Sequence, residues 1–202
     1  MSKTARQFDS ANLVLATHNK GKIIEIAARL AAMPITLLSA HDLDLPEPEE
    51  TGDTFEANAA LKALAAAKAT GKVALADDSG LSVSALGGAP GIYSARWAGD
   101  DKDFKAAMRR VHNELGDTNN RAAAFICTIA LAWPDGHVEI TRGECEGTII
   151  WPMRGADGFG YDPIFQPEGF NTTFGEMNLE QKQQLSHRRK ALDRIFEQCF
   201  TH

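Results

Sequence analysis

Apolar residues along the first third of the chain fall at two spacings, which predict strands alternating with helices. Residues 12–16 form a short apolar run typical of a buried strand, and residues 23–32 carry apolar positions at helical spacing. Pro34 is expected to end this helix, because proline interrupts helical hydrogen bonding. Residues 35–38 then predict a second short strand.

The middle of the chain continues this alternation. Thr54 is a suitable N-cap for an alanine-rich helix that runs to about Thr70 and ends at Gly71. The glycine-rich segment 86–97 predicts a conformationally demanding loop. A further helix is expected from Asp100 and Asp101 through about Leu115.

The second half predicts a hairpin. Residues 121–133 and 136–150 read as strands, and the proline and glycine of 133–137 predict a tight turn between them. Residues 152–175 lack a period and predict a structured functional loop, and 186–200 predict a last helix. Strands that alternate with helices and are followed by a hairpin favour an α/β fold with a mixed central β-sheet flanked by helices.

Composition narrows the classes of protein that fit this pattern. The 202 residues are 44% apolar and 24% charged, as in a globular protein of one domain or two closely packed lobes. No apolar run approaches the roughly 20 residues of a membrane span. Residues 1–10 lack the hydrophobic segment of a signal peptide and are predicted to be a disordered lead-in. One domain is then expected over residues 11–202. The formal charge of -6 argues against a nucleic-acid-coating surface. Cys127, Cys145 and Cys199 have no metal-ligand spacing and read as reduced thiols of a cytoplasmic protein.

Two adjacent acids follow the apolar run 73–76. We expect this strand to carry Asp77 and Asp78 to its C-terminal edge, where Gly80 would allow a tight change of direction. Successive side chains on a strand point to opposite faces, so the two acids should diverge, one toward a lysine or helix end and the other into a cleft. An acidic edge suits a hard cation such as Mg²⁺. Taken alone, an Asx-type turn fits the motif better.

The loop after the first strand nearly fits a phosphate-binding P-loop. The motif requires Ser or Thr after its lysine, but Ile23 occupies that place and Ala16 replaces the usual first glycine. A P-loop kinase or ATPase is therefore a second candidate with a specific defect. What remains at this strand-to-helix junction is a set of side chains able to grip a triphosphate: Thr17, Asn19 and Lys22.

Three further groups of residues suggest a ligand-binding surface. Asn58 and Lys62 lie four residues apart and therefore share one helix face. Phe159 could stack on a base, and Asp162 could accept hydrogen bonds from ring N–H groups. His187 and Arg188 could bind a purine carbonyl or phosphates, although a solvated basic turn is the better explanation when they are taken alone.

Six motifs occur in order between Asn12 and the last helix. They are Thr17-x-Asn19-x-x-Lys22, Glu50-Thr51-Gly52-x-Thr54-Phe55-x-x-Asn58-Ala59, Ala76-Asp77-Asp78-Ser79-Gly80-Leu81, Leu86-Gly87-Gly88-Ala89-Pro90-Gly91-Ile92-Tyr93-Ser94-Ala95-Arg96, Gly158-Phe159-Gly160-Tyr161-Asp162-Pro163 and Ser186-His187-Arg188. Each is modest alone, but in this order they resemble the inosine triphosphate pyrophosphatase family. The resemblance implies a two-lobed fold with the active site in the cleft between the lobes. It also implies a cytoplasmic homodimer that uses Mg²⁺ to hydrolyse ITP, dITP and XTP to the monophosphate and pyrophosphate.

The resemblance also implies roles for individual residues. Asp78 would be the catalytic acid, both metal ligand and general base, with Asp77 beside it and with Lys22 and Lys62 near the phosphates. Glu50 would be a further metal ligand, although Glu47 or Glu49 could take that place. The remaining substrate contacts would come from Thr17, His18, Asn19, Lys20, Gly21, Asn58, Ser79, Phe159, Gly160, Tyr161, Asp162, Lys182, His187 and Arg188. A nucleotide-binding regulatory module without turnover is the alternative from another class.

Overall fold

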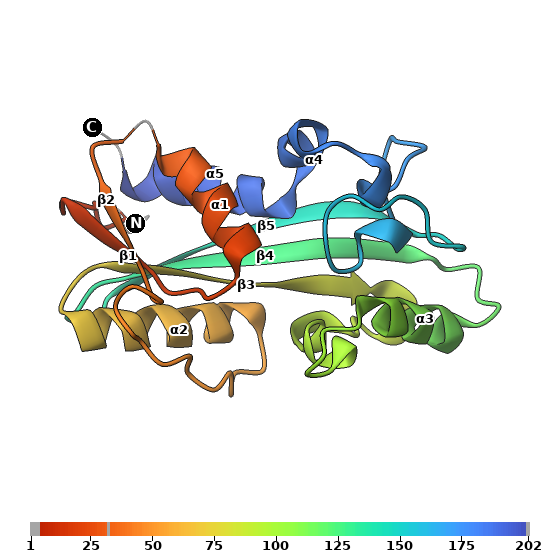
Figure 1. Ribbon diagram of the computed structural model, residues 1–202, viewed down its shortest axis with the longest axis horizontal. Coiled ribbons are helices and arrows are strands. Elements are labelled where there is room, and N and C mark those ends of the chain that lie inside the picture. The colour runs from red at the N-terminus through yellow and green to blue at the C-terminus, as the bar shows by residue number, and fades with distance from the viewer. Residues whose placement is uncertain (1–4, 32, 201–202) are drawn as a thin grey trace. The chain divides into compact units, whose positions relative to one another are not determined.

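The computed structural model describes residues 5–31 and 33–200; residues 1–4, 32 and 201–202 lie outside this description. Strands and helices alternate through the first half, and a pair of long strands follows (Figure 1). The elements are β1 (Asn12–Leu15), α1 (Lys20–Leu30), β2 (Thr36–Ser39), α2 (Phe55–Thr70), β3 (Ala74–Val83), α3 (Phe104–Leu115), β4 (Ala122–Ala132), β5 (Val138–Ile149), β6 (Phe165–Pro167), α4 (Leu179–Leu185) and α5 (His187–Cys199).

The six strands form one mixed sheet in the order β2-β1-β3-β4-β5-β6. Strand β1 pairs in parallel with β2 and with β3, whereas β6 pairs antiparallel with β5. Neighbouring strands β4 and β5 are joined by a tight turn in which the Trp133 amide donates to the His137 carbonyl at 2.9 Å. The predicted α/β fold with a mixed sheet, and the predicted hairpin, are therefore confirmed.

Two compact units are each built from separate segments of the chain. The first unit comprises Met1–Asp78, Thr128–Arg142 and Ala191–His202, and the second comprises Ser79–Cys127 and Gly143–Lys190. Strands β3, β4 and β5 and helix α5 contribute residues to both units. Within the first unit α1 and α2 lie on opposite faces of the sheet, and within the second α3 and α4 do so (Figure 1).

Small side chains let α2 pack closely on the sheet of the first unit. Thr54 caps the helix by accepting from the Ala57 amide at 3.1 Å, and Gly71 ends it in the left-handed conformation, as predicted. Most buried residues of α2 are alanines, which bring the helix backbone near the strands, so that polar residues on α2 can reach groups on β3. The cluster consists of Val14, Ala59, Ala63, Ala66, Ala67, Ala74, Ala76, Ala130 and Ala132.

Larger and aromatic side chains fill the core of the second unit. Phe125 meets Phe165 edge-on, with ring centroids 4.6 Å apart, and it lies 5.9 Å from the ring of Phe174. Phe165 and Phe174 are fully buried, as is Ile164 beside them. The segment 152–175, predicted to be a structured loop, thus contributes much of this core.

Strand β3 does not end at the two acids, so one prediction from the sequence was wrong. The strand runs to Val83, and Gly80 is an ordinary extended residue within it, not a turn. Glycine is required there for a different reason. A Cβ atom at this position would collide with the Gly91 carbonyl oxygen and lie 2.5 Å from Ser94 Oγ. The loop 86–97 therefore packs directly against the β3 backbone.

Helix boundaries differ from the predictions where polar side chains act as caps. Helix α1 begins at Lys20, three residues early, because Asn19 caps it; it ends at Leu30, and the predicted end at Ala32 lies outside the described residues. Helix α3 begins at Phe104 because Asp103, not Asp100, supplies the cap.

In the described part of the chain, no helix combines the length and apolarity needed to cross a membrane.

The predicted disordered lead-in falls partly on residues 1–4, outside the described residues. The remaining residues of the lead-in, 5–10, belong to the described part of the chain, and two of them make contacts within the first unit. Arg6 forms an ion pair with Asp135 at 2.6 Å, and the Phe8 ring stacks on Phe200 with centroids 4.7 Å apart.

Replacing Gly80 with alanine should destabilise the protein by roughly 1–3 kcal/mol, because the added methyl group would overpack a backbone contact. Urea unfolding followed by tryptophan fluorescence measures the loss. Gly71→Asn is the matched control: its left-handed position is open and tolerates asparagine, so it should cost less than about 1 kcal/mol. Equal losses in the two variants would contradict the proposed close approach at Gly80.

Candidate active site

The loop after β1 is organised by its own side chains. Asn19 Oδ1 accepts from the amides of Gly21 and Lys22 at 3.0 and 3.2 Å, and Thr17 Oγ1 accepts from the Asn19 amide. In a P-loop such amides would cradle phosphate. Here two of them are already bonded to Asn19, which further disfavours the P-loop alternative.

Asp77 and Asp78 each face a lysine, on opposite faces of β3. Asp77 Oδ2 lies 2.9 Å from Lys22 Nζ on α1, and Asp78 Oδ1 lies 3.6 Å from Lys62 Nζ on α2. The predicted divergence of the two acids is therefore confirmed. Both acids are buried, with relative exposures of 1% and 6%, which disfavours the alternative of a solvated Asx-type turn.

Lys62 also contacts Glu50, which comes from the acidic loop before α2. The Lys62 ammonium donates to Glu50 Oε1 and thus lies between two carboxylates. Of the three glutamates considered from the sequence, Glu50 is half-buried, whereas Glu47 and Glu49 are exposed. The structure therefore brings Glu50 to the cluster with Asp78.

The charges of this cluster do not balance. The pKa of Asp78 is raised to about 6, chiefly by burial; Lys62 and Lys22 oppose this rise, and Glu50 and Asp77 contribute to it. Burial lowers the pKa of Lys62, but Asp78, Asp77 and Glu50 together hold it above its ordinary value. Three carboxylates thus share two ammonium groups in a site with little water.

This donor set fits a hard divalent cation. No group of three or more His, Cys, Asp or Glu side chains among the described residues is arranged as a complete metal site. Glu50 and Asp78 already flank one cation, the Lys62 ammonium, and surplus negative charge surrounds it. Mg²⁺-like ions are commonly held by one or two carboxylates, with the remaining ligands from water and substrate phosphate. The residues present therefore suit a cation that binds together with a phosphate.

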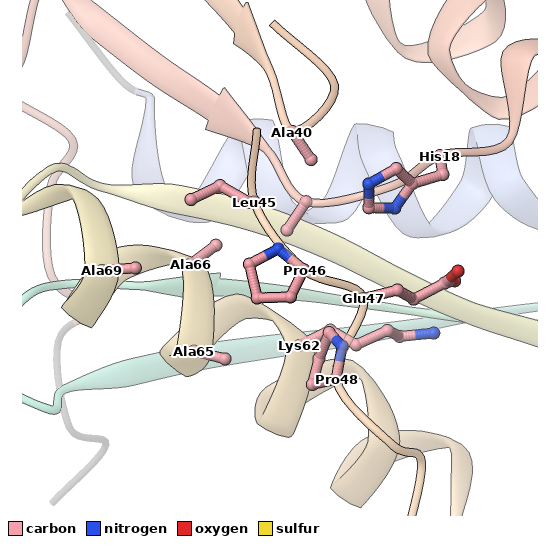
Figure 2. A pocket seen from close by; sticks show the side chains of 11 residues that line it. His18, Ala40, Leu45, Pro46, Glu47, Pro48, Lys62, Ala65, Ala66 and Ala69 are labelled. Atoms are coloured by element: carbon pink, nitrogen blue, oxygen red, sulfur yellow. The ribbon is translucent and has the colours of Figure 1, made fainter. Parts of the chain in front are cut away.

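A pocket of about 90 Å³ opens between β1, the loop 40–48 and α2 within the first unit. Alanine and proline side chains line one part of it, and the polar ends of Glu47 and Lys62 extend to the same side (Figure 2). His18 also lines the pocket, so two of the predicted substrate residues, His18 and Lys62, share one cavity. The side chain of Lys20, another predicted contact, lies outside the described residues.

In the second unit, the start of α5 buries the three residues of the last motif, of which His187 and Arg188 were predicted to contact substrate. Ser186 caps the helix by accepting from the Arg189 amide at 3.1 Å, His187 stacks on Phe125 with centroids 5.0 Å apart, and Arg188 donates to Ser79 Oγ at 3.2 Å. His187 and Arg188 are only 6% and 3% exposed. They are not the solvated basic turn that the sequence alone permitted.

Asp162 holds the neighbouring aromatic loop together. Its Oδ2 atom accepts from the Phe159 amide at 2.7 Å and from the Lys182 ammonium. Lys182 Nζ lies 4.4 Å from the centroid of the Phe159 ring, which is 44% exposed. Phe159 is thus an exposed ring that is open to stacking on a base, and Lys182 lies beside it. The contact of Asp162 with a base stays a prediction.

Tyr161 points away from solvent, although the sequence suggested a substrate contact. It is 3% exposed and its hydroxyl donates to the Ser94 carbonyl at 2.8 Å. Burial raises the pKa of Tyr161 well above its ordinary value, so the hydroxyl remains a donor. Gly160 next to it adopts a positive φ of 67° and permits the sharp turn. Tyr161 therefore positions the loop that carries Phe159.

Sequence reasoning missed two supporting residues. Ser94 Oγ accepts from the Leu81 amide and donates to the Gly91 carbonyl, which fixes the glycine-rich loop on β3. Its motif was recognised, but nothing marked the serine itself. Phe125, which supports His187, looks like any apolar residue of a strand. No signal in one sequence could have singled it out.

The first unit presents carboxylates and lysines that suit an anionic ligand bound with a cation, and the second presents an arginine and an exposed aromatic ring that suit a base. The chain belongs to the Ham1 family, whose profile matches residues 13–198. The family resemblance inferred from the motifs is confirmed.

Similar proteins cover nearly the whole chain. It is 56% identical to a dITP/XTP pyrophosphatase of Rhodospirillum centenum (96% of this chain, 98% of the relative) and 54% identical to one of Gluconobacter oxydans (94% and 91%). A HAM1 protein structure from Coxiella burnetii matches with a TM-score of 0.87 at 39% identity, covering 92% of this chain and 96% of that one. The Staphylococcus aureus Ham1 structure matches with a TM-score of 0.84 at 42% identity, covering 91% and 95%.

The raised pKa of Asp78 predicts a pH-dependent stability difference between the wild type and Asp78→Asn. Well below pH 3.8 the carboxyl is protonated in both folded and unfolded states, so the variant should match the wild type. Between about pH 4 and pH 6 the unfolded chain loses this proton while the folded protein keeps it, so only the wild type loses stability, and the loss is complete above about pH 6. We expect Asp78→Asn to be more stable at pH 7.5 by roughly 2–3 kcal/mol.

Urea unfolding of metal-free protein at pH 4 and pH 7.5 tests this difference. Asp101→Asn removes an exposed acid and should show no such change between the two pH values. A variant less stable than wild type at pH 7.5 would contradict the assigned charge imbalance.

Proposed function

We propose that this protein hydrolyses non-standard purine nucleoside triphosphates, namely ITP, dITP and XTP, to the nucleoside monophosphate and pyrophosphate. The observation that carries the proposal is the Lys62 ammonium held between Glu50 and Asp78, with Lys22 on Asp77 at the other face of β3. This arrangement supplies cations for phosphate and carboxylates for a metal and a water. The relatives named dITP/XTP pyrophosphatase support the same substrate class.

The reaction is attack of water on the α-phosphorus. A bond forms from the water oxygen to phosphorus, the bond to the pyrophosphate oxygen breaks, and Asp78 takes a proton from the water. A carboxylate with a pKa of about 6 is a better base than ordinary aspartate, yet it is deprotonated at neutral pH. Lys22 and Lys62 stabilise the negative charge that builds on the phosphoryl oxygens.

The proposed cofactor is Mg²⁺, held by Glu50 and Asp78 together with the substrate. When bound, it supplies further neutralisation of phosphoryl charge.

We also propose that the protein is a cytoplasmic homodimer, which the family resemblance implies. Analytical ultracentrifugation at micromolar concentration tests the dimer: a single species of about 22 kDa would contradict it.

In this proposal the second unit recognises the base. Arg188 or His187 donates to O6 of hypoxanthine or xanthine, and Phe159 stacks on the ring. Adenine carries an amino group at that position, so a buried donor would face another donor and lose its hydrogen bond. Arg188 is already oriented by Ser79, and His187 by Phe125.

The products released from each nucleotide distinguish the proposed activity from the two alternative functions. A P-loop ATPase would release orthophosphate from ATP and ignore ITP, and a regulatory module would bind ITP without turnover. With Mg²⁺ and 0.1 mM nucleotide, we expect pyrophosphate from ITP, dITP and XTP, and little product from ATP or GTP. Orthophosphate as the first product would refute the proposed bond cleavage.

Asp78→Asn should lower kcat for ITP by roughly 10²–10⁴-fold, because it removes both a base and a metal ligand. Nucleotide binding should persist, since the lysines remain. Steady-state pyrophosphate release and calorimetric titration with ITP measure the two quantities. A kcat near the wild-type value would refute the proposed role of Asp78 as base and metal ligand.

Arg188→Ala should raise the KM for ITP by roughly 10–100-fold, the equivalent of one lost hydrogen bond to a charged group. Arg189→Ala is the matched control, because Arg189 is the exposed neighbour of buried Arg188 on the same helix. An unchanged KM in Arg188→Ala, or equal effects in both variants, would refute base recognition by Arg188.

A further inference from the structure

Asn58 lies on α2 one turn before Lys62 and is fully buried. Its Oδ1 atom accepts a hydrogen bond from the Gly52 amide at 2.8 Å. Gly52 belongs to the acidic loop before the helix, two residues after Glu50. The side chain therefore joins the helix that carries Lys62 to the loop that carries Glu50.

The contact between Gly52 and α2 is too close for any side chain on residue 52. A Cβ atom there would lie 2.7 Å from Asn58 Oδ1 and 2.7 Å from the Ala57 Cβ. Glycine at this position is thus explained by close packing of its backbone on the helix. Gly52 is therefore held by its hydrogen bond to Asn58 and by close packing against α2.

Backbone hydrogen bonds hold the acidic loop near its two ends. Residues 46–52 form no helix or strand. The loop is anchored at its start by the Leu45 amide, which donates to the Ala40 carbonyl at 2.9 Å, and near its end by the Gly52–Asn58 bond. Glu50 lies between these two anchors, next to the second. Its position against Lys62 depends on where Gly52 is held.

The amide of Asn58 is costly to bury. Its Nδ2 atom is buried and has no hydrogen-bond partner among the described residues. An apolar side chain would avoid the cost of this unsatisfied donor. Packing alone therefore does not account for asparagine at this position, whereas the bond accepted from Gly52 does.

We infer that Asn58 is a positioning residue that fixes Gly52 and thereby holds Glu50 beside Lys62 and Asp78, in place of the substrate contact expected from the sequence. The consequence for catalysis rests on the proposed function, because there Glu50 is a ligand of the cation. The structural part of the inference, the anchoring of the loop, is independent of that function.

Hydrogen–deuterium exchange tests the anchoring directly. Asn58→Leu keeps an apolar side chain of similar size and removes the acceptor, so the peptide covering 46–54 should exchange at least about tenfold faster. Thr128→Val is the matched control: it removes another fully buried polar group of the first unit, whose hydroxyl donates to Glu56 at 3.3 Å. The control should leave exchange of 46–54 unchanged. Equal exchange of this segment in wild type and Asn58→Leu would overturn the inference.

Kinetics tests the link to Glu50. Asn58→Leu should raise the Mg²⁺ concentration for half-maximal ITP hydrolysis about tenfold, as loss of a group that orients a metal ligand does. In the Glu50→Gln background the same change should cost less than about twofold, because the residue being positioned is already altered. Losses that multiply in the double variant would overturn the link to Glu50.

A second pair of variants covers the case in which Asn58→Leu does not fold. Asn58→Ala removes the acceptor without adding bulk, and Gly52→Ala displaces the loop from the other side of the contact. Both should accelerate exchange of 46–54, and unchanged exchange in both would overturn the inference. If the wild type releases no pyrophosphate, the proposed function fails, while the exchange result still decides the anchoring.

Discussion

Two buried carboxylates and the half-buried Glu50 share two lysines in the first unit, and the candidate chemistry depends on this imbalance. Asp77 is paired with Lys22, while Asp78 and Glu50 compete for Lys62. Burial is the main cause of the raised pKa of Asp78; Glu50 and Asp77 add to the rise, and Lys62 and Lys22 oppose it. A polyphosphate alone would add to the negative charge. A polyphosphate that arrives with a divalent cation relieves it, which fits a metal-dependent nucleotide hydrolase.

The candidate base-binding groups of the second unit follow a different principle. Arg188, His187 and Lys182 are buried and oriented by Ser79, Phe125 and Asp162 respectively. Groups held in place before binding lose little entropy when the ligand arrives, and they discriminate through unsatisfied hydrogen bonds. The exposed ring of Phe159 is the part left open to solvent.

The sequence predicted the elements and most candidate residues, because spacing, caps and motifs are local properties. The long helix from Thr54 to Gly71 and the divergence of Asp77 and Asp78 are examples. Contacts between distant segments could not be predicted from the sequence. Gly80 predicts a turn there, because nothing near it in the sequence shows that the loop 86–97 packs against its Cα. The choice of Glu50 among three nearby glutamates likewise depends on the path of a loop without regular structure.

The pKa of Asp78 is the most direct test of how burial and the neighbouring charges act on this carboxyl. In metal-free protein, carbon-13 NMR titration of the Asp78 carboxyl should give a pKa of about 6. Lys62→Met should raise this pKa further, because it removes the nearest positive charge. A pKa at the ordinary value of 3.8, or one that Lys62→Met leaves unchanged, would contradict the account.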